Sequence, residues 1–444
     1  MSTTRFGPDA TGRLESFAAV RSLSFEAPLP KLLRVRRASD VVPGVDVARA
    51  VSAALAPACR RLRAGASVAV TAGSRGIASA PVLYRSVGEV LSAHGARPFL
   101  VAAMGSHAGG TAAGRLEMLA HLGVTPASVA MPVVSSDAFV EIASARSGPV
   151  LVAREAAEAD HVLAVNRVKP HTDFHGPIES GLAKILAVGL AGPEGAITAH
   201  SGGPERLGER IVERADALVS TGKILGGLAA LENERHEIAG IHFVAPEGIG
   251  HTAEAALLED ARSHVARLPF GDIDVLVVAE LGKDVSGAGM DPNVLGRMRI
   301  EGVDEPASPR IGVVVALALT RASAGNAIGI GLADITTLRV LESADIAATY
   351  VNALTAGRGG IRRAAMPIAL PTDRDAVCAA LAACGEPDPA RRRLVLVADT
   401  LSLADLVVSE PLREDVVSDP DLAIVEEIGP MTFDEHGSLL TTVR

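Results

Sequence analysis

The sequence predicts an α/β fold with two domains, each built on a largely parallel sheet flanked by helices. Three observations lead to this prediction. The chain has 444 residues, more than one ordinary hydrophobic core accommodates. Apolar residues make up 48% of the chain and aromatic residues only 2%, so small aliphatic side chains must form the core. Short runs of these side chains alternate with longer helical patterns.

Seven of the short apolar runs are expected to be strands. They span residues 66–72, 98–104, 161–166, 241–245, 274–280, 310–319 and 393–399. Near-continuous apolar strands are typical of parallel sheets that are covered on both faces. The helices that cover them are expected from amphipathic patterns at 78–94, 112–122, 204–220 and 252–267.

A domain boundary is expected near residue 268. In the segment HVARLPFGDIDVLVV (264–278), a helical pattern ends, Pro and Gly interrupt the chain, and a new buried strand begins. We therefore assign 1–268 to an N-terminal domain and 269–444 to a C-terminal α/β domain. The active site is expected in the cleft between them, with the second domain closing over the substrate.

Composition argues against several classes of function. The formal charge is −10 and aromatic rings are scarce, so we expect no nucleic-acid partner. The first residues, MSTTRFGPDATGRLESF, lack an apolar stretch, and no later run approaches a membrane span. Three cysteines without CxxC spacing predict buried thiols in a reducing compartment. The expected location is the cytoplasm.

Polar residues follow four of the predicted strands. VAVTAGSRG and LVAAMGSHAG lead to Arg75 and His107, which are 32 residues apart, about the length of a βαβ unit. VLAVNRVKPH leads to His171, and VLVVAELGKDVSG leads to Lys283. Because ligands of open α/β sheets bind beyond the carboxyl ends of the strands, we expect these residues to form one site.

Each of these residues also has an ordinary explanation. Arg75 is either a solvated loop charge or a bidentate clamp for a carboxylate or phosphate. His107 lies in GSHAGGT, a Gly-rich setting that favours an acid/base or anion-binding role over a chance loop position. His171 and His175 follow Pro170, so they cannot form a helical zinc motif, and His171 is favoured because it follows the strand directly.

Two further segments carry candidates. Lys184 lies in SGLAKILAVGL, where it either extends its amine to water or serves as a Schiff base, a covalent cofactor attachment or a phosphate contact. The Gly-rich segment 280–299, ELGKDVSGAGMDPNVLGRMR, is expected to be a binding loop, because so long a polar stretch after a buried strand commonly carries function.

Taken in order, AGSRG, GSHAGGT, KPHTDFHGPIESGLAK and ITAHSGG resemble the lactate racemase superfamily of nickel-pincer enzymes. The resemblance covers the N-terminal domain and extends more loosely into the second domain through GKDVSGAGMDPNVLGR. It implies a racemase or epimerase of a 2-hydroxy acid, in which a pyridinium-derived nucleotide holds a nickel ion. It also implies partner proteins that assemble this cofactor.

The resemblance assigns cofactor roles to particular residues. Lys184 would be the covalent tether, and His200, sixteen residues later, would be the nickel ligand. Three further residues are expected to contact the cofactor: Ser74, Gly105 and His175.

The resemblance also assigns the substrate and acid/base roles. His107 and His171 would be the acid/base pair, one for each face of the substrate. Arg75 would hold the substrate's polar groups, and a basic residue of the 283–299 loop, which is Lys283, Arg297 or Arg299, would bind its carboxylate. Inversion of a 2-hydroxy acid by hydride removal needs an electron-accepting carbon that side chains do not offer, so a cofactor is required.

The chain departs from the lactate enzymes in two places. HGPIESGLA, with Glu179, replaces a shorter Gly-rich passage, and Ala72 stands where the lactate enzymes carry an acidic residue. We therefore expect a larger polyhydroxy or dicarboxylic acid as the substrate.

Two other functions remain as alternatives. One is a metal-dependent hydrolase that uses His107, His171, His175 and His200. The other is a non-catalytic protein that binds an anion or metabolite, with Arg75 and the Gly-rich loops as its cradle.

Overall fold

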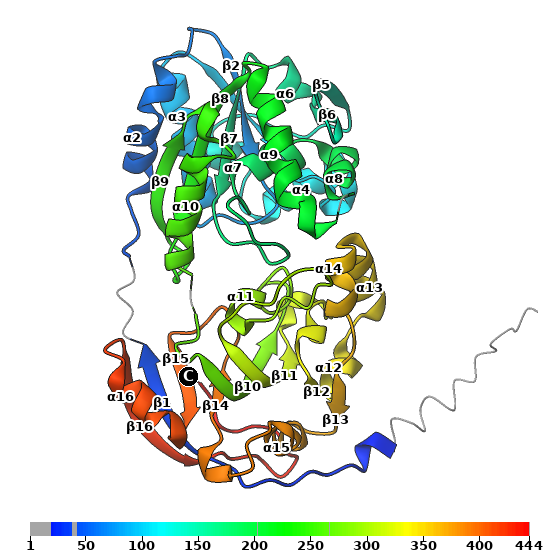
Figure 1. Cartoon of the computed structure of the whole chain (residues 1–444). Coiled ribbons are helices and arrows are strands. Elements are labelled where there is room, and N and C mark those ends of the chain that lie inside the picture. Colours follow the sequence, from blue (N-terminus) through cyan, green and yellow to red (C-terminus); the bar gives the residue numbers. More distant parts are fainter. Residues whose placement is uncertain (1–18, 38–41, 202, 266, 444) are drawn as a thin grey trace, which may run out of the picture. The chain divides into compact units, whose positions relative to one another are not determined.

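The computed structural model describes residues 19–37, 42–201, 203–265 and 267–443 (Figure 1). The chain forms two compact units. One is Val41–Val265, and the other combines the described part of Met1–Asp40 with Ala266–Arg444. Both contain a predominantly parallel sheet flanked by helices, so the predicted α/β class is confirmed.

The unit Val41–Val265 is built on a six-stranded sheet in the order β4-β3-β2-β7-β8-β9. All neighbouring strands pair in parallel except β9, which is antiparallel to β8. The strands are β2 Ser67–Ala72, β3 Arg97–Ala102, β4 Val133–Val134, β7 His161–Arg167, β8 Ile224–Glu232 and β9 Ile238–Val244. A separate hairpin pairs β5 Phe139–Ala145 with β6 Gly148–Ala153.

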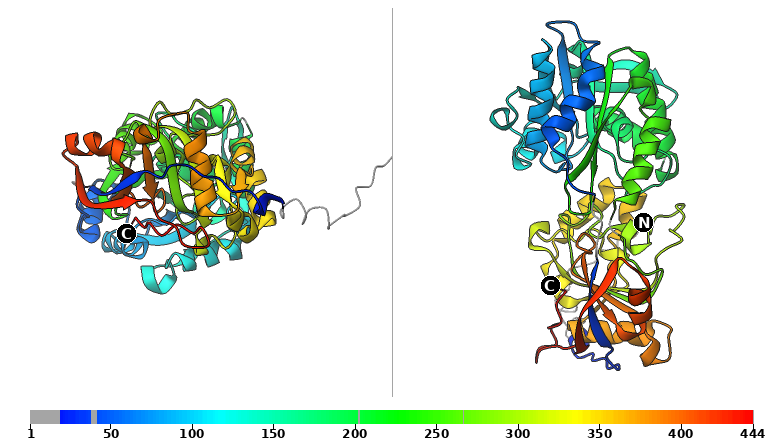
Figure 2. Two further views of the ribbon diagram at one scale, coloured as in Figure 1. Left: turned by 90° about the horizontal axis from the view of Figure 1, so that it is seen from below. Right: turned by 90° about the vertical axis from the view of Figure 1, so that its left-hand side faces the viewer.

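Alternating residues of these strands point into two hydrophobic clusters. Val68 and Val70 of β2 pack in one cluster with Leu83, whereas Ala69 packs in the other with Ile211. The right-hand view of Figure 2 accordingly shows this sheet between helices drawn in blue and helices drawn in green. The helices of this unit are α2 Val47–Cys59, α3 Ala80–Ala93, α4 Ala112–His121, α5 Pro126–Val129, α6 Arg154–Glu158, α7 Leu182–Lys184, α8 Gly192–His200, α9 Pro204–Ser220 and α10 Thr252–Ser263.

The second unit has an eight-stranded sheet in the order β13-β12-β11-β10-β14-β15-β1-β16. Strands β13 to β14 of this order are parallel, and the remaining pairings are antiparallel. The strands are β1 Lys31–Arg37, β10 Asp272–Leu281, β11 Arg310–Leu319, β12 Ile335–Thr337, β13 Ile368–Leu370, β14 Leu394–Val397, β15 Asp405–Ser409 and β16 Leu422–Pro430. Its helices are α11 Pro292–Leu295, α12 Leu338–Ser343, α13 Ile346–Thr355, α14 Arg358–Arg363, α15 Asp373–Ala383 and α16 Arg413–Ser418.

The N-terminal strand departs from the expected division into 1–268 and 269–444. Strand β1 lies between β15 and β16, where Val35 is opposite Leu406 on one side and Ile424 on the other. Its apolar side chains, including Val35, are buried in the clusters of the second unit. The second unit resumes at Ala266, close to the expected boundary, but it also takes in the strand that we had assigned to the first domain.

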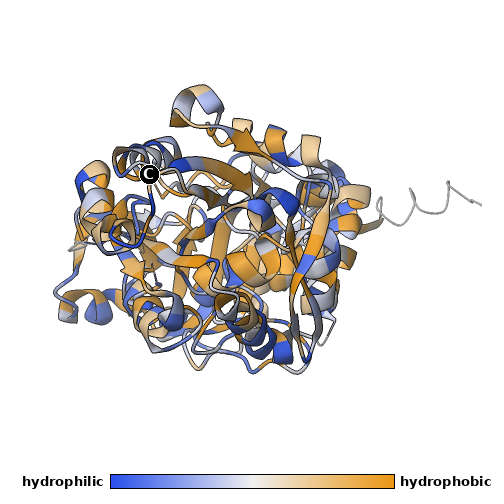
Figure 3. Ribbon diagram, turned by 90° about the horizontal axis from the view of Figure 1, so that it is seen from above, coloured by the Kyte–Doolittle hydropathy of each residue, from blue (hydrophilic) through white to orange (hydrophobic). Residues whose placement is uncertain are grey.

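Hydropathy follows this layering. In Figure 3, hydrophobic colours dominate the strands, while the helices and loops around them carry both kinds of residue. Among the described residues, no single helix is long and apolar enough to cross a membrane. The helical pair Leu182–Gly189 and Gly192–His200, bent by 113°, meets the length and composition criteria only when both halves are combined.

Candidate active site

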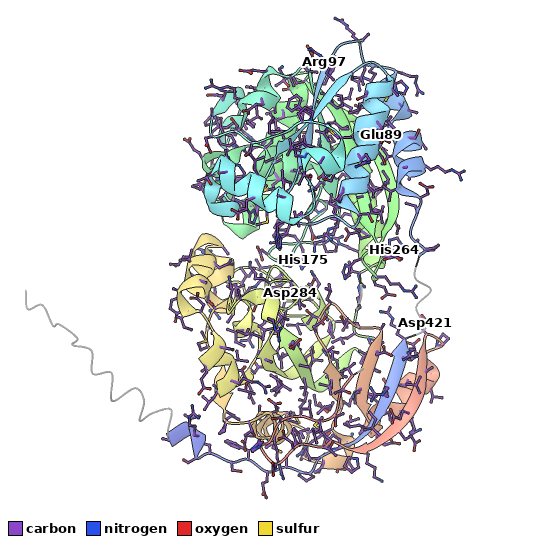
Figure 4. All side chains as sticks on the ribbon, turned by 180° about the vertical axis from the view of Figure 1, so that it is seen from behind. Glu89, Arg97, His175, His264, Asp284 and Asp421 are labelled. Atoms are coloured by element: carbon purple, nitrogen blue, oxygen red, sulfur yellow. The ribbon has the colours of Figure 1, made fainter. Side chains whose placement is uncertain are left out.

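The candidate residues lie on loops at the carboxyl ends of three adjacent parallel strands. Arg75 follows β2, His107 follows β3 and His171 follows β7, and these strands are neighbours in the order β3-β2-β7. Figure 4 shows the polarity of the sheet, because Arg97 at the start of β3 and His175 in the loop after β7 lie at opposite ends of this unit. The expected position beyond the carboxyl ends is therefore observed.

Lys184 and His171 are in direct contact. The Nζ atom of half-buried Lys184 contacts Nε2 of His171 and lies 5.7 Å from the ring centroid of Phe174. The backbone N–H of Asp173 donates to Nδ1 of His171 at 3.0 Å. Because Nδ1 accepts, the neutral imidazole carries its proton on Nε2, and the partner that this proton requires is an unprotonated amine.

The surroundings of Lys184 favour the unprotonated form of its amine. Burial lowers the pKa of Lys184 to about 8; the charge of Asp173 opposes this shift, and the charges of Arg75 and Lys169 add to it. Burial, followed by the charge of Lys184, also holds the pKa of His171 well below its usual value of 6.5. His171 is consequently neutral at physiological pH.

A buried carboxylate sets the start of the helix that carries Lys184. Glu254 of α10 accepts hydrogen bonds from the backbone N–H groups of Leu182 at 2.6 Å and Ala183 at 3.2 Å. A Cβ atom on Gly181 would lie 2.2 Å from Glu254 Oε1, so the glycine in SGLAK leaves room for this carboxylate. The amide of Asn166, in β7, donates to the Gly181 carbonyl at 2.7 Å and ties the helix to the sheet.

The helix continues as a π-helical turn at Ile185–Gly189, against which the loop after β3 packs. The N–H of Gly105 donates to the Gly189 carbonyl at 2.9 Å. Gly105 has φ 55°, and a Cβ atom there would lie 3.1 Å from the Val188 carbonyl oxygen. Gly105, predicted to contact the cofactor, thus allows the His107 loop to approach the helix of Lys184 closely.

His107 has the opposite tautomer to His171. Its Nδ1 lies 2.9 Å from the carbonyl oxygen of Met104, which can only accept, so Nδ1 carries the proton and the lone pair is on Nε2. Ser74 Oγ lies 3.2 Å from the same Nδ1 and joins the loops after β2 and β3. Ser74, also predicted to contact the cofactor, therefore contacts one of the predicted acid/base groups.

His200, the last residue of α8, has its Nδ1 2.7 Å from the carbonyl oxygen of Ala196. This hydrogen bond leaves the lone pair of the neutral ring on Nε2. Metal-binding histidines usually donate their other ring N–H in this way. Desolvation lowers the pKa of His200, the bond to Ala196 opposes the shift, and the charge of Lys184 adds to it.

Arg75 is exposed, and within the described residues its guanidinium makes no hydrogen bond and no ion pair. Its charge interacts with those of Asp173 and Arg167. The loop that carries it is held by Glu232, which accepts a hydrogen bond from the Ala78 N–H at 2.8 Å and pairs with Arg167 at the end of β7. An arginine with its donors available on a fixed loop suits the binding of a carboxylate.

Two predicted substrate-binding residues belong to the second unit. Lys283 donates from Nζ to the Gly287 carbonyl at 3.1 Å and to Asn352 Oδ1 at 3.2 Å. Arg297 is engaged within its own unit, because it pairs with Asp334 at 2.6 Å and donates to the Ile311 carbonyl at 2.6 Å. These contacts attach the 280–299 loop to the sheet and favour a structural role for Arg297.

His175 differs from His171 in its contacts. Its Nδ1 is 3.3 Å from Glu179 Oε1, and its side chain is 37% exposed. Among the described residues, no three His, Cys, Asp or Glu side chains are grouped closely enough to hold a metal ion. The hydrolase alternative, with its four histidines, required a group of this kind.

Comparisons with known proteins give a match to a family model and matches among solved structures. A family model described as a domain of unknown function (DUF362) matches residues 68–243, which include Arg75, His107, His171, Lys184 and His200. No curated protein matches the chain. Among solved structures, that of the lactate racemase apoprotein from Thermoanaerobacterium thermosaccharolyticum is similar, with a TM-score of 0.47 and 13% sequence identity. The match covers 86% of this chain and 96% of that chain.

Proposed function

We propose that this chain is a racemase or epimerase of a 2-hydroxy acid that uses a nickel-pincer nucleotide attached to Lys184. The observation that carries the proposal is the contact between Lys184 and His171 at the ends of strands that also present Arg75 and His107. A lysine with a pKa of about 8 is a nucleophile near neutral pH, as covalent attachment requires.

The residues present fit such a cofactor. Lys184 offers an amine for the tether, and His200 offers one metal ligand, Nε2, with its tautomer fixed by Ala196. Since the described residues contain no group of three protein ligands, the rest of the coordination sphere would come from the nucleotide. When bound, this group would supply the electron-accepting centre for hydride that side chains lack.

The protein side chains would supply binding and proton transfer. Arg75 would hold the carboxylate or a hydroxyl group of the substrate and keep the planar keto acid in place between the two half-reactions. His107, with its lone pair on Nε2, would take the hydroxyl proton as a base. His171 would serve the other face: its Nε2–H would hydrogen-bond the keto oxygen, and when the ring is protonated it would return a proton to that oxygen and become neutral.

We assign the second acid/base role to His171 because it contacts Lys184, whereas His175 pairs with Glu179. Lys283 is the basic residue of the 280–299 loop that we propose for the substrate carboxylate, since Arg297 is paired with Asp334. Ala72 in place of an acidic residue supports a polyhydroxy or dicarboxylic acid as the substrate.

Intact and peptide mass spectrometry with metal analysis, on protein from a host shown to make the cofactor, tests the proposal. We expect a nucleotide-sized adduct on the Lys184 peptide together with bound nickel. Lys184→Ala should remove the adduct. The control Lys223→Ala should retain it, because Lys223 donates to the Ala159 carbonyl near the amino ends of the strands.

Activity measurements complete the test. His107→Ala and His171→Ala should each lose at least about 100-fold in racemisation rate while they keep nickel, because each removes one proton-transfer group. Wild-type rates in both variants would rule out the two-histidine mechanism. An unmodified Lys184 in wild-type protein from such a host would contradict the tether. Ligand binding that survives loss of both histidines, without turnover in the wild type, would instead support the anion-binding protein.

A further inference from the structure

The loop that carries His171 is wrapped around one buried carboxylate. The Glu179 side chain is completely buried, with an exposed fraction of 0%. Its oxygens accept hydrogen bonds from the backbone N–H groups of His171 at 2.5 Å and Gly176 at 3.1 Å. Nδ1 of His175 lies 3.3 Å away, so three groups of a single loop converge on this carboxylate.

A second element holds the carboxylate from outside the loop. Arg262, near the end of α10, donates from Nη2 to Glu179 Oε1 at 2.6 Å and to the Gly176 carbonyl at 2.8 Å. Desolvation would raise the pKa of Glu179, but the hydrogen bonds from His175, His171, Arg262 and Gly176 together outweigh it and lower the pKa. Glu179 is thus ionised, and its charge is matched by Arg262.

We propose that Glu179, held by Arg262, is a positioning residue that keeps the proton of His171 on Nε2. The link between them is geometric. Glu179 fixes the backbone N–H of His171 itself, and two residues later the N–H of Asp173 turns back onto Nδ1 of the same histidine. If the carboxylate no longer held the loop, that N–H would lose its alignment and the proton could move to Nδ1. The inference rests on the proposed acid/base role of His171.

Glu179→Gln tests the proposal with little change of volume. The amide replaces one accepting oxygen with an N–H donor that faces donors from the loop and from Arg262. We expect kcat to fall by about 10- to 100-fold, as is typical when a group that orients a functional side chain is lost, with KM changed by less than about threefold. The adduct on Lys184 and the bound nickel should remain.

Glu259→Gln is the matched control. Glu259 pairs with the same Arg262, at 2.8 Å, but its side chain is 74% exposed and lies outside the loop. Its loss should leave kcat unchanged. If Glu179→Gln does not fold, Arg262→Lys is the second variant. It should fold because Arg262 is only partly buried and lysine keeps the charge. It loses the paired hydrogen bonds that the guanidinium donates to Glu179 and to the Gly176 carbonyl. It should lower kcat in the same direction.

A spectroscopic measurement separates this proposal from the proposed function. In full-length protein labelled with ¹⁵N-histidine, long-range ¹H–¹⁵N spectra report which ring nitrogen carries the proton, and His171→Gln identifies the His171 signal. We expect the Nε2–H form in the wild type and in Glu259→Gln, and a mixture of both forms in Glu179→Gln and Arg262→Lys. An unchanged tautomer or an unchanged kcat in both loop variants would overturn the positioning role and leave the proposed function standing. A tautomer shift in the two loop variants, combined with a wild-type protein that racemises no hydroxy acid, would refute the proposed function and not the positioning role of Glu179.

Discussion

The amine of Lys184 lies in a desolvated environment that disfavours its charged form, and this lowers the free energy of unfolding. With a folded pKa of about 8 against about 10.5 in the unfolded chain, the native state binds its proton more weakly. Lys184→Met should therefore raise the free energy of unfolding of the cofactor-free protein at pH 7 by about 1–3 kcal/mol, as expected where function opposes stability. Urea unfolding followed by circular dichroism measures this change.

The matched substitution is Lys223→Met, which removes a lysine bonded to the Ala159 carbonyl and should not stabilise the protein. The pH dependence gives a second check. Between about pH 8 and 10.5 the unfolded state binds more protons at Lys184, so this residue makes the free energy of unfolding rise with pH. A destabilised Lys184→Met variant would show that the contacts of the amine outweigh its desolvation.

His171 contributes in a lower pH range. The pKa of His171 in the folded protein is well below 6.5, the value expected in the unfolded chain. Below about pH 6.5 the unfolded state therefore binds a proton at His171 that the native state does not bind. Stability due to this residue is complete above about pH 6.5, and as the pH falls it is lost at up to about 1.4 kcal/mol per pH unit until the folded pKa is reached. Urea unfolding between pH 5 and 7 should show a steeper slope for the wild type than for His171→Gln. Equal slopes would mean that the pKa of His171 is the same in the native and unfolded states.

Single residues at strand ends could be found from the sequence because β3, β2 and β7 are parallel and adjacent, so their carboxyl ends meet. The residues that position them could not be found in this way. Glu254 and Arg262 look like ordinary polar positions of a surface helix, and each reaches its partners across more than 70 residues of sequence. Glu179 was noticed only as a departure from the resembled motif.

At the scale of elements, the helix of Lys184 depends on a carboxylate from α10. Glu254 is 1% exposed and accepts from Leu182, Ala183 and Gly250. Glu254→Gln should lower the free energy of unfolding by about 1–3 kcal/mol, because an amide donor would face these N–H groups and leave part of the helix start unsatisfied. It should also lower the fraction of chains that carry the Lys184 adduct. Chemical unfolding and intact mass spectrometry measure the two effects.

The exposed Glu247, seven residues earlier, supplies the control, and Glu247→Gln should change stability by less than about 0.5 kcal/mol. If Glu254→Gln unfolds like the wild type, the carboxylate does not hold the helix. If stability falls while full adduct remains, Glu254 supports the fold without positioning Lys184.

Strand prediction succeeded for the longer continuous apolar runs. All seven predicted strands are present, but the other strands of the described structure were not predicted, and among them is the central strand β8, with the sequence ILGGLAALE. Its two glycines do not end the strand; they allow neighbouring side chains to pack closely against it. A Cβ on Gly226 would lie 2.4 Å from the Phe243 ring, and one on Gly227 would lie 2.5 Å from a Leu182 methyl. Leu182 can therefore pack closely on the sheet only because residue 227 is glycine. The same glycines interrupt the apolar run, which is why the strand was not predicted from the sequence.

At the scale of the whole chain, the hydrophobic clusters keep the two units separate. Each cluster formed by the described residues draws its members from one unit, and the N-terminal strand β1 contributes to the clusters of the second. The order of the sequence does not reveal this arrangement, because the strands that pair with β1 begin only at Asp405 and no local pattern near β1 indicates them. Strand β1 is also the sole partner of β16 in the described sheet.

Because each hydrophobic cluster belongs to one unit, a destabilising substitution in β1 should lower the stability of the second unit only. Val35 is completely buried between β15 and β16, so Val35→Asp should destabilise the second unit by more than about 3 kcal/mol through a buried, unpaired charge. Hydrogen–deuterium exchange of the full chain should then quicken in Asp405–Ser409 and Leu422–Pro430 and stay unchanged in Ser67–Ala72 and His161–Arg167. Arg36→Ala is the control, since Arg36 is mostly exposed and forms only a surface pair with Asp405. Faster exchange in all four strands would show that the units unfold together, and faster exchange confined to the first unit would contradict the placement of β1.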